Sequence, residues 1–169
     1  MQGSNSKIKK VYLSLGSNWG DRASYISSAI KRIDKIEGVR IAAASSRYLT
    51  EPFDIDTSEW FINCAVEIET SLPASELLDR FITIESEMGR PLIRKKKMPR
   101  SIDIDILLYG DDIISTDSLI IPHSEMCRRK FVLVPLAEIA SEVVHPGNGL
   151  TIKELLERCE DKSKVIKQG

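Results

Sequence analysis

The feature of this sequence that most restricts its fold is an alternation of apolar and polar side chains over residues 60–69. One set of alternating positions is apolar and comprises Ile62, Cys64, Val66 and Ile68. The positions between them include Phe61, Asn63, Glu67 and Glu69. Successive side chains of a β-strand point to opposite faces of its sheet, so this period of two predicts a strand with one face in a hydrophobic core.

Further strands and two helices flank this strand in the sequence. Before it, residues 11–15 and 40–48 have β-type composition, and the segment between them has helical apolar spacing that Asp21 can cap. After it, Pro73 opens a second helical pattern, and residues 102–109 form another strand pattern. The order strand, helix, strand, strand, helix, strand predicts an α+β fold with a ferredoxin-like βαββαβ core.

The last quarter of the chain is expected to add shorter elements to this core. Residues 119–121 are apolar, residues 131–139 suit a helix or a strand, and Thr151 with Glu154 matches a capping box for a last helix. The 169 residues contain no internal repeat, linker or low-complexity segment. We therefore expect one domain over residues 1–169, with residues 1–6 as a disordered tail.

Charge and cysteine content exclude several classes of function. The net charge is −1, so no overall field attracts nucleic acid or an anionic membrane. The three cysteines include no C-x-x-C pair, which argues against a disulfide framework or a zinc site and suits a reducing cytosol. The sequence begins without the apolar region of a signal peptide and contains no membrane-spanning run. We expect a cytoplasmic monomer without nucleic-acid or membrane partners.

Two acidic residues interrupt an isoleucine-rich strand pattern and are the strongest sign of chemistry. Asp103 and Asp105 alternate with Ile102, Ile104 and Ile106. On a strand, the two carboxylates would share the face opposite the isoleucines, with their Cα atoms roughly 6.5 Å apart. A cation between them would relieve their repulsion, and Mg²⁺ prefers such oxygen ligands. Without the surrounding sequence, a solvated outer strand face would be the better explanation of the pair.

A basic segment leads directly into this acidic pair. Residues 90–100 contain six cations and no acid: Arg90, Arg94, Lys95, Lys96, Lys97 and Arg100. A nucleoside triphosphate bound through Mg²⁺ needs carboxylates for the metal and guanidinium groups for the phosphates. Lys95, Lys96 and Lys97 also fit an ordinary solvated loop, whereas Arg100 is held next to the strand. Phosphate-loop, dinucleotide-binding and protein-kinase motifs are all missing from the sequence.

Two other groups suit a bound substrate. His123 lies in a second basic segment and can donate a hydrogen bond to a phosphate oxygen. Phe61 and Asn63 share one strand face, where a flat heteroaromatic ring could stack on the phenyl group while the amide binds its edge. Each residue alone is also compatible with ordinary packing. His145 has no such neighbours, and we expect it to be structural.

The residues described above, together with their neighbours, resemble the 6-hydroxymethyl-7,8-dihydropterin pyrophosphokinase family of folate biosynthesis. The segments that carry the resemblance are residues 12–18, 46–53, 61–65, 85–90, 99–110, 121–123 and 129–136. The run Arg100-Ser101-Ile102-Asp103-Ile104-Asp105 is the most specific of them. The resemblance implies a ferredoxin-like core in three α/β/α layers. It also implies transfer of the pyrophosphoryl group of ATP to the hydroxymethyl oxygen of the pterin, with release of AMP.

The resemblance also implies roles for particular residues. Asp103 and Asp105 would hold two Mg²⁺ ions against the phosphates of ATP. The triphosphate contacts would come from Arg90, Arg100, His123 and Arg129, with Arg90 and Arg100 also counted as catalytic. The pterin would be bound by Asn63, by Thr50 and Phe53 with the backbone between them, and by a sandwich of Phe61 and Phe131. The chain departs from the family pattern at Lys97-Met98, where Trp-Gly is common, and at Ser124-Glu125, where Pro-Arg is common.

Two other functions remain compatible with parts of the pattern. Many ferredoxin-like domains bind RNA on their sheet, but the aromatic RNA-binding motif is missing here and acidic residues occupy the corresponding face. A metal-dependent nucleotidyltransferase would combine a Gly-Ser pair with Asp-x-Asp. Such enzymes are expected to have these two pieces close in sequence, whereas Ser17 and Asp103 are far apart in this chain.

Overall fold

The computed structural model describes residues 7–53, 57–89 and 101–168. Its main sheet has six strands, which are β1 Lys9–Ser17, β2 Val39–Ala44, β3 Tyr48–Thr50, β4 Phe61–Thr70, β5 Asp103–Tyr109 and β8 Val165–Lys167. A small second sheet consists of β6 Ile114–Ser115 and β7 Ile120–Ile121. The helices are α1 Arg22–Asp34, α2 Ala74–Glu87, α3 Lys130–Ala140 and α4 Ile152–Arg158, with a 3-10 turn, η1, at Met126–Arg128. This combination confirms the predicted α+β class.

The main sheet is antiparallel, with β1 and β4 at its centre. Its strands follow the order β5-β1-β4-β3-β8, and β2 also pairs with β4. Strand β4 is long enough, at ten residues, to hold two partners on the same edge. Strand β2 pairs with its C-terminal half, whereas β3 pairs with its first residues. The strand predicted from the alternation at residues 60–69 is therefore the one to which most of the sheet is attached.

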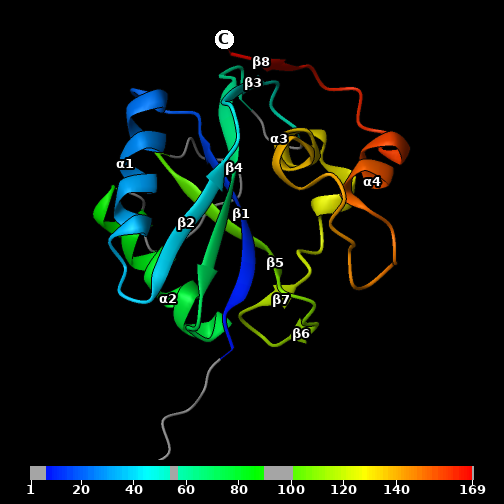
Figure 1. Ribbon diagram of the computed structural model, residues 1–169. Coiled ribbons are helices and arrows are strands. Elements are labelled where there is room, and N and C mark those ends of the chain that lie inside the picture. Colours follow the sequence, from blue (N-terminus) through cyan, green and yellow to red (C-terminus); the bar gives the residue numbers. More distant parts are fainter. Residues whose placement is uncertain (1–6, 54–56, 90–100, 169) are drawn as a thin grey trace, which may run out of the picture.

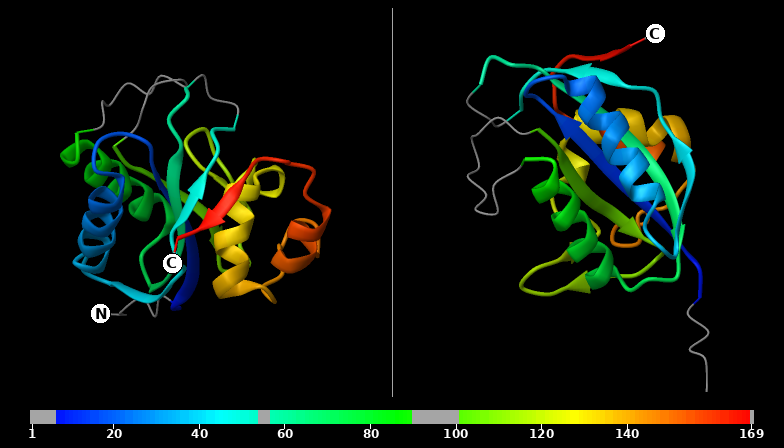
Figure 2. Two further views of the ribbon diagram at one scale, coloured as in Figure 1. Left: turned by 90° about the horizontal axis from the view of Figure 1, so that it is seen from above. Right: turned by 90° about the vertical axis from the view of Figure 1, so that its left-hand side faces the viewer.

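Helices cover both faces of the sheet. Figure 1 shows α1 and α2 on one side of the strands and α3 and α4 on the other, and the view from above in Figure 2 shows the same arrangement. The apolar side chains form two clusters, one under each pair of helices. Ile62, Cys64 and Val66 of β4 belong to the first cluster, whereas Ala65 belongs to the second. The predicted alternation thus corresponds to burial on both faces.

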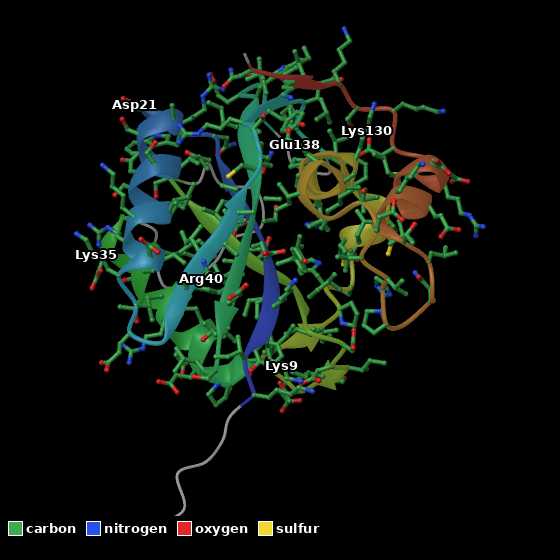
Figure 3. The ribbon with its side chains drawn as sticks, viewed as in Figure 1. Lys9, Asp21, Lys35, Arg40, Lys130 and Glu138 are labelled. Carbon is green, nitrogen blue, oxygen red and sulfur yellow. The ribbon has the colours of Figure 1, made fainter. Side chains whose placement is uncertain are left out.

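Two predicted helix caps are present. Asp21 is the N-cap residue of α1, and its carboxylate accepts a hydrogen bond from the Ser24 amide at 3.1 Å. Figure 3 labels Asp21 at this end of the helix. Thr151 and Glu154 form a complete capping box at the start of α4. Pro73, predicted as the first residue of a helix, is instead the residue that precedes α2. Its ring is tolerated there because no intrahelical amide is lost.

The structure divides one predicted strand and adds one that was not predicted. Residues 40–48 separate into β2 and β3, and the ladder is interrupted at Ser45 and Ser46. The Ser45 amide still donates to the Ala65 carbonyl, but the Ala65 amide donates to the Ser45 hydroxyl, and the Ser46 amide donates to Glu138. Strand β8 is too short to show a period. Residues 131–139, predicted as a helix or a strand, lie within α3. Among the described residues, no helix is both long and apolar enough to cross a membrane.

Candidate active site

A cavity of about 380 Å³ lies at the end of the sheet where β4 and β5 begin, on the face that α3 covers. Strands β1, β3, β4 and β5 supply its floor, and the segment from η1 to the start of α3 supplies a wall. The lining residues are Ser14, Gly16, Thr50, Glu51, Phe53, Phe61, Asn63, Asp103, Asp105, Ser124, Glu125, Arg128, Arg129 and Phe131. The cavity therefore gathers residues from five separate parts of the sequence.

Strand register brings the predicted amide and the predicted acids onto one floor. Asn63 of β4 lies opposite Gly16 of β1, and Gly16 lies opposite Asp103 of β5. In the neighbouring row, Ser14 of β1 lies opposite Asp105. Two strand spacings separate Asn63 from Asp103, which places their Cα atoms about 10 Å apart. A molecule with a ring at one end and a charged group at the other can span that distance.

The two acids face the cavity as the alternation predicted. Asp103 and Asp105 are half-buried and line it, whereas Ile102, Ile104 and Ile106 are buried in the core on the opposite face. Carboxylate oxygens are the ligands that Mg²⁺ prefers, and this ion usually completes its shell with water and substrate phosphates. Among the described residues, no group of three or more acidic, histidine or cysteine side chains is placed to hold a metal. Two protein carboxylates are compatible with a Mg²⁺ ion whose other ligands are water and phosphate oxygens.

A third acid, not selected from the sequence, positions the strand between these two. Glu85 of α2 is buried, and its Oε2 accepts a hydrogen bond from the Ile104 amide at 2.9 Å. Ile104 stands between Asp103 and Asp105. The carboxylate thus ties α2 to the backbone that carries both cavity acids. A glutamate in the apolar stripe of a predicted helix would have been the signal.

The amide of Asn63 is held in a fixed orientation. Its Nδ2 donates a hydrogen bond to Thr50 Oγ1 at 2.7 Å, and both residues are buried. The Asn63 Oδ1 lies over Gly16, where an added Cβ would come within 2.4 Å of it. Glycine is therefore required at position 16 for close approach of the amide rather than for backbone conformation. Nothing local in the sequence indicated this contact, because it depends on the pairing of β1 with β4.

Aromatic side chains form the walls beside this amide. Phe53, Phe61 and Phe131 all line the cavity, and Phe61 is buried. The guanidinium carbon of Arg129 lies 5.7 Å from the centre of the Phe131 ring, which is within cation–π range. A planar heterocycle can stack on such surfaces while its edge bonds to Asn63 and Thr50.

The wall that precedes α3 carries the positive charge of the described part of the site. Arg128 forms an ion pair of 2.5 Å with Glu125, and both residues line the cavity. Arg129 Nε, by contrast, is buried and has no hydrogen-bond partner among the described residues. A buried guanidinium nitrogen without a partner is costly unless a ligand supplies an acceptor. The Arg129 side chain therefore favours an anionic ligand.

His123 lies in an adjoining cavity of about 250 Å³ that shares Asp105 and Ser124 with the first. Its Nδ1 accepts a hydrogen bond from the Glu125 amide at 3.1 Å, which assigns the proton to Nε2. Burial, reinforced by the charge of Arg129, lowers the pKa of His123 although Asp103 and Glu125 oppose the shift. The ring is therefore a neutral hydrogen-bond donor at neutral pH.

Most of the predicted site residues meet in these two cavities. Thr50, Phe53, Phe61, Asn63, Asp103, Asp105, Arg129 and Phe131 line the first, and His123 lines the second. Arg90, Arg94, Arg100 and the Lys97-Met98 departure lie outside the described residues. His145 lines neither cavity, and its Nδ1 accepts hydrogen bonds from the Gly147 and Asn148 amides, as expected of a structural histidine.

A family model described as 7,8-dihydro-6-hydroxymethylpterin-pyrophosphokinase matches residues 12–141. The chain belongs to this family. The pyrophosphokinase match runs from within β1 to the end of α3 and includes every residue that lines the two cavities. Helix α4 and strand β8 lie beyond it.

Curated relatives agree with the pyrophosphokinase family. A 2-amino-4-hydroxy-6-hydroxymethyldihydropteridine pyrophosphokinase of Methylorubrum extorquens is 40% identical over 154 residues, which cover 90% of this chain and 95% of the relative. The Bacillus subtilis protein of the same name is 44% identical over 134 residues, or 79% of each chain. The folic acid synthesis protein fol1 of Pneumocystis carinii is 40% identical over 89% of this chain, which spans only 20% of that protein. These relatives give no support to the RNA-binding and nucleotidyltransferase alternatives.

Solved structures of the pyrophosphokinase type share the fold. The wild-type HPPK-DHPS protein of Plasmodium falciparum, crystallised with pteroate, superposes with a TM-score of 0.71 at 17% sequence identity. The match covers 90% of this chain and 44% of the other. The chain thus spans less than half the length of that protein. The likeness concerns the fold alone.

Proposed function

We propose that this chain transfers the pyrophosphoryl group of ATP to the hydroxymethyl group of 6-hydroxymethyl-7,8-dihydropterin, giving AMP and the pterin diphosphate in folate biosynthesis. The observation that carries this proposal is a single cavity with an aromatic and amide end, a pair of carboxylates, and a buried guanidinium nitrogen that has no partner in the described part of the chain. Family membership agrees with it. Each of these features matches one part of the two substrates.

The aromatic and amide end suits the pterin. Phe61 and Phe131 would sandwich its ring, with Phe53 completing the wall. Asn63 and Thr50, held to each other by their hydrogen bond, would read the edge of the ring together with the backbone between Thr50 and Phe53. Because the amide is already oriented, little side-chain freedom is lost on binding. The hydroxymethyl group would then point along the floor toward Asp103.

Asp103 and Asp105 are the residues that would hold Mg²⁺, and we propose two ions with bound ATP. Their shared strand face, their place in the cavity and their oxygen donors fit this cation. When bound there, magnesium neutralises charge on the phosphate oxygens as AMP leaves. The Glu85 hydrogen bond to Ile104 keeps both acids at a fixed spacing, so the strand does not have to rearrange when the substrates bind.

Arg129 and His123 would bind the triphosphate from the wall opposite the acids. Arg129 Nε would gain its missing acceptor, and the neutral His123 ring would donate from Nε2. Arg90 and Arg100, which lie outside the described residues, are proposed as further phosphate contacts and catalytic cations on sequence grounds. Holding the hydroxymethyl oxygen in line with the attacked phosphorus would contribute much of the rate.

We also propose a ferredoxin-like, three-layer α/β/α architecture for this chain as one domain over residues 1–169. The order β5-β1-β4-β2 within the sheet and the helices on both of its faces support this description. The three cysteines are free thiols, which suits a cytoplasmic protein. The protein would be a monomer that binds ATP and the reduced pterin. It would have no nucleic-acid or membrane partner.

Product identification tests the proposed reaction. The protein is incubated with ATP, Mg²⁺ and the reduced hydroxymethylpterin, and both products are separated and identified. AMP together with the pterin diphosphate is the expected result. Release of free pyrophosphate with a nucleotidylated product would contradict pyrophosphoryl transfer.

Substitution of the oriented amide tests the assignment of the two ends. Asn63→Ala should weaken pterin binding by about tenfold or more, since a buried polar contact to the ring is lost, while ATP binding stays nearly unchanged. Asn148→Ala, an asparagine outside both cavities, is the matched control. Equal losses for pterin and ATP in Asn63→Ala would refute the assignment.

A further inference from the structure

The C-terminal segment of the chain returns to the sheet beside β3, a strand next to the cavity, although it lies beyond the family match. Strand β8 is added to the edge of the sheet beside β3, more than twenty residues after the match ends at residue 141. Figures 1 and 2 show the end of the chain lying along β3. We call residues 161–168 the C-terminal strap.

The strap supports the strand that carries one wall of the cavity. Strand β3 has only three residues and ends at Thr50, which lines the cavity. Glu51 and Phe53, which follow it, line the cavity as well. On one side β3 pairs with β4, and on the other it pairs with β8 in the register Tyr48–Lys167, Leu49–Ile166 and Thr50–Val165. Without β8, this three-residue strand would form the edge of the sheet.

Hydrogen bonds extend the pairing beyond the strand at both ends. The Glu51 amide donates to the Lys164 carbonyl at 3.0 Å, and the Lys164 amide donates to Glu51 Oε1 at 2.6 Å. At the other end, the Gln168 amide donates to the Arg47 carbonyl at 2.8 Å. The strap is therefore bonded along the whole of residues 47–51.

The same strap also holds the opposite wall. Asp161 Oδ2 accepts a hydrogen bond from the amide of Lys130, the first residue of α3, at 3.0 Å. Arg129 and Phe131, on either side of Lys130, line the cavity. Asp161 itself is oriented by hydrogen bonds from the Ser163 amide, at 2.8 Å, and the Ser163 hydroxyl. One short segment thus connects the Thr50 wall to the Phe131 wall.

A second connection lies behind the first. Glu138 of α3 accepts hydrogen bonds from the Tyr48 hydroxyl at 2.5 Å and the Ser46 amide at 2.6 Å, and the Lys167 ammonium lies 3.7 Å from its Oε1. Figure 3 shows Glu138 on the side of α3 that faces the sheet and Lys130 near the start of the same helix. Helix α3, β3 and β8 therefore meet at one carboxylate.

We propose that the C-terminal strap is a positioning element that sets the spacing of the two walls around the pterin ring. This inference rests on the proposed function. The strap holds Thr50 and Phe53 on one side and Phe131 on the other, so loosening it weakens ring binding. Asp103 and Asp105 lie on β5, four strand spacings or about 19 Å from β8, and Arg129 adjoins Lys130 rather than β8, so loosening the β8 pairing leaves ATP binding nearly unchanged.

Two proline substitutions in the full chain separate this role from general stability. In an antiparallel ladder, hydrogen-bonded and non-hydrogen-bonded pairs alternate. Because Glu51 bonds to Lys164 and Gln168 bonds to Arg47, the amide of Ile166 points toward β3 and that of Val165 points away. Ile166→Pro removes a ladder donor, whereas Val165→Pro removes none and is tolerated at a sheet edge.

We expect Ile166→Pro to raise the KM for the pterin about tenfold, with the KM for ATP changed by less than about twofold. Val165→Pro should behave as the unmodified chain does. Asp161→Ala should also raise the pterin KM, and because Lys130 adjoins Arg129 it should raise the KM for ATP as well. Asp161→Asn, which keeps an oxygen acceptor, should restore part of both losses. Equal pterin KM values for the two proline variants, or parallel losses for pterin and ATP in Ile166→Pro, would overturn the inference.

Hydrogen exchange on the unmodified chain gives an independent test that does not depend on a variant folding. Coupling between two events is reciprocal, so ring binding must strengthen strap attachment if the strap strengthens ring binding. The pterin, added with Mg²⁺ and a non-hydrolysable ATP analogue, should slow exchange at the amides of Glu51, Ile166 and Gln168. Unchanged exchange at these amides, with the pterin bound, would refute the role of the strap.

Failure of this inference is distinguishable from failure of the proposed function. If the unmodified chain releases no AMP from ATP and the pterin, the proposed function fails. If it releases AMP while the proline pair and the exchange data show no effect of the strap, only this inference fails.

Discussion

Gly16 and Asn63 show how closely the cavity floor is fitted at the level of single residues. Gly16→Ala would place a Cβ within 2.4 Å of Asn63 Oδ1, so the amide must move from its bond to Thr50. A displacement of about 1 Å at a binding group can cost about 10²-fold in turnover. We expect a loss of that order in kcat/KM for the pterin, measured at saturating ATP.

A double-mutant cycle identifies the cause of this loss. If the contact with Asn63 is responsible, Gly16→Ala should lower the Tm much less in an Asn63→Ala background than alone, because the clashing oxygen is gone. Additive changes in Tm would mean that position 16 requires glycine for another reason.

The cavity acids should matter far more for turnover than for folding. Asp105→Asn keeps the shape of the side chain but removes its charge, and we expect kcat to fall about 10³-fold with only a small change in Tm. The same expectation holds for Asp103→Asn. A variant of either acid that kept its turnover would remove the metal assignment, and a circular-dichroism melt shows whether the fold is retained.

Glu85 is a single residue that positions both cavity acids through the backbone of β5. Its carboxylate is buried on α2 and accepts the Ile104 amide, so the two cavity acids are positioned by a helix on the other side of the sheet. The face of β5 that lines the cavity and the face in the core are therefore coupled through one hydrogen bond.

At the scale of elements, the C-terminal helix allows a test of stability without loss of function. Thr151→Ala removes half of the capping box of α4 and should cost about 1 kcal/mol, lowering the Tm by roughly 2–4 °C. The threonine control is Thr83→Ala on the exposed side of α2, which should leave the Tm nearly unchanged. We expect turnover to be unaffected in both, since neither residue lines the cavities.

Helices and strands whose apolar residues recur with a clear period were predictable from the sequence, and those without such a period were not. The alternation of β4 and β5, the apolar spacing of α1 and α2, and the caps at Asp21 and Thr151 all correspond to observed elements. The division between β2 and β3 was not predictable, because it depends on Ser46 meeting Glu138, ninety-two residues away in sequence. Strand β8 was missed because three residues carry no detectable pattern.

At the scale of the whole molecule, the two histidines make stability depend on pH. The pKa of His123 is lowered by burial and then by Arg129, and that of His145 is lowered by burial. The unfolded chain therefore binds more protons than the folded chain between these lowered values and the ordinary histidine pKa of about 6.5. Stability must fall as the pH decreases through that window.

We expect the Tm to decrease between pH 7 and pH 5.5, and the decrease to shrink when His123→Asn and His145→Asn are combined. An asparagine oxygen can occupy the place of each Nδ1 acceptor, so the local hydrogen bonds survive. These are the only histidines of the chain, which makes the double variant a complete test of this contribution. An unchanged slope of Tm against pH would show that the histidines do not cause it.

The sequence by itself determined the kinds and order of the strongly periodic elements and marked Asp103, Asp105 and Asn63 as candidate site residues, because periodicity and residue type are local properties of the chain. Only the tertiary structure decided that Asn63, Gly16 and Asp103 stand in one row, since register is a relation between strands. It also decided that Glu85 supports the acids and that the last residues connect the two cavity walls. Such contacts join positions far apart in sequence, and they form only when the layers pack.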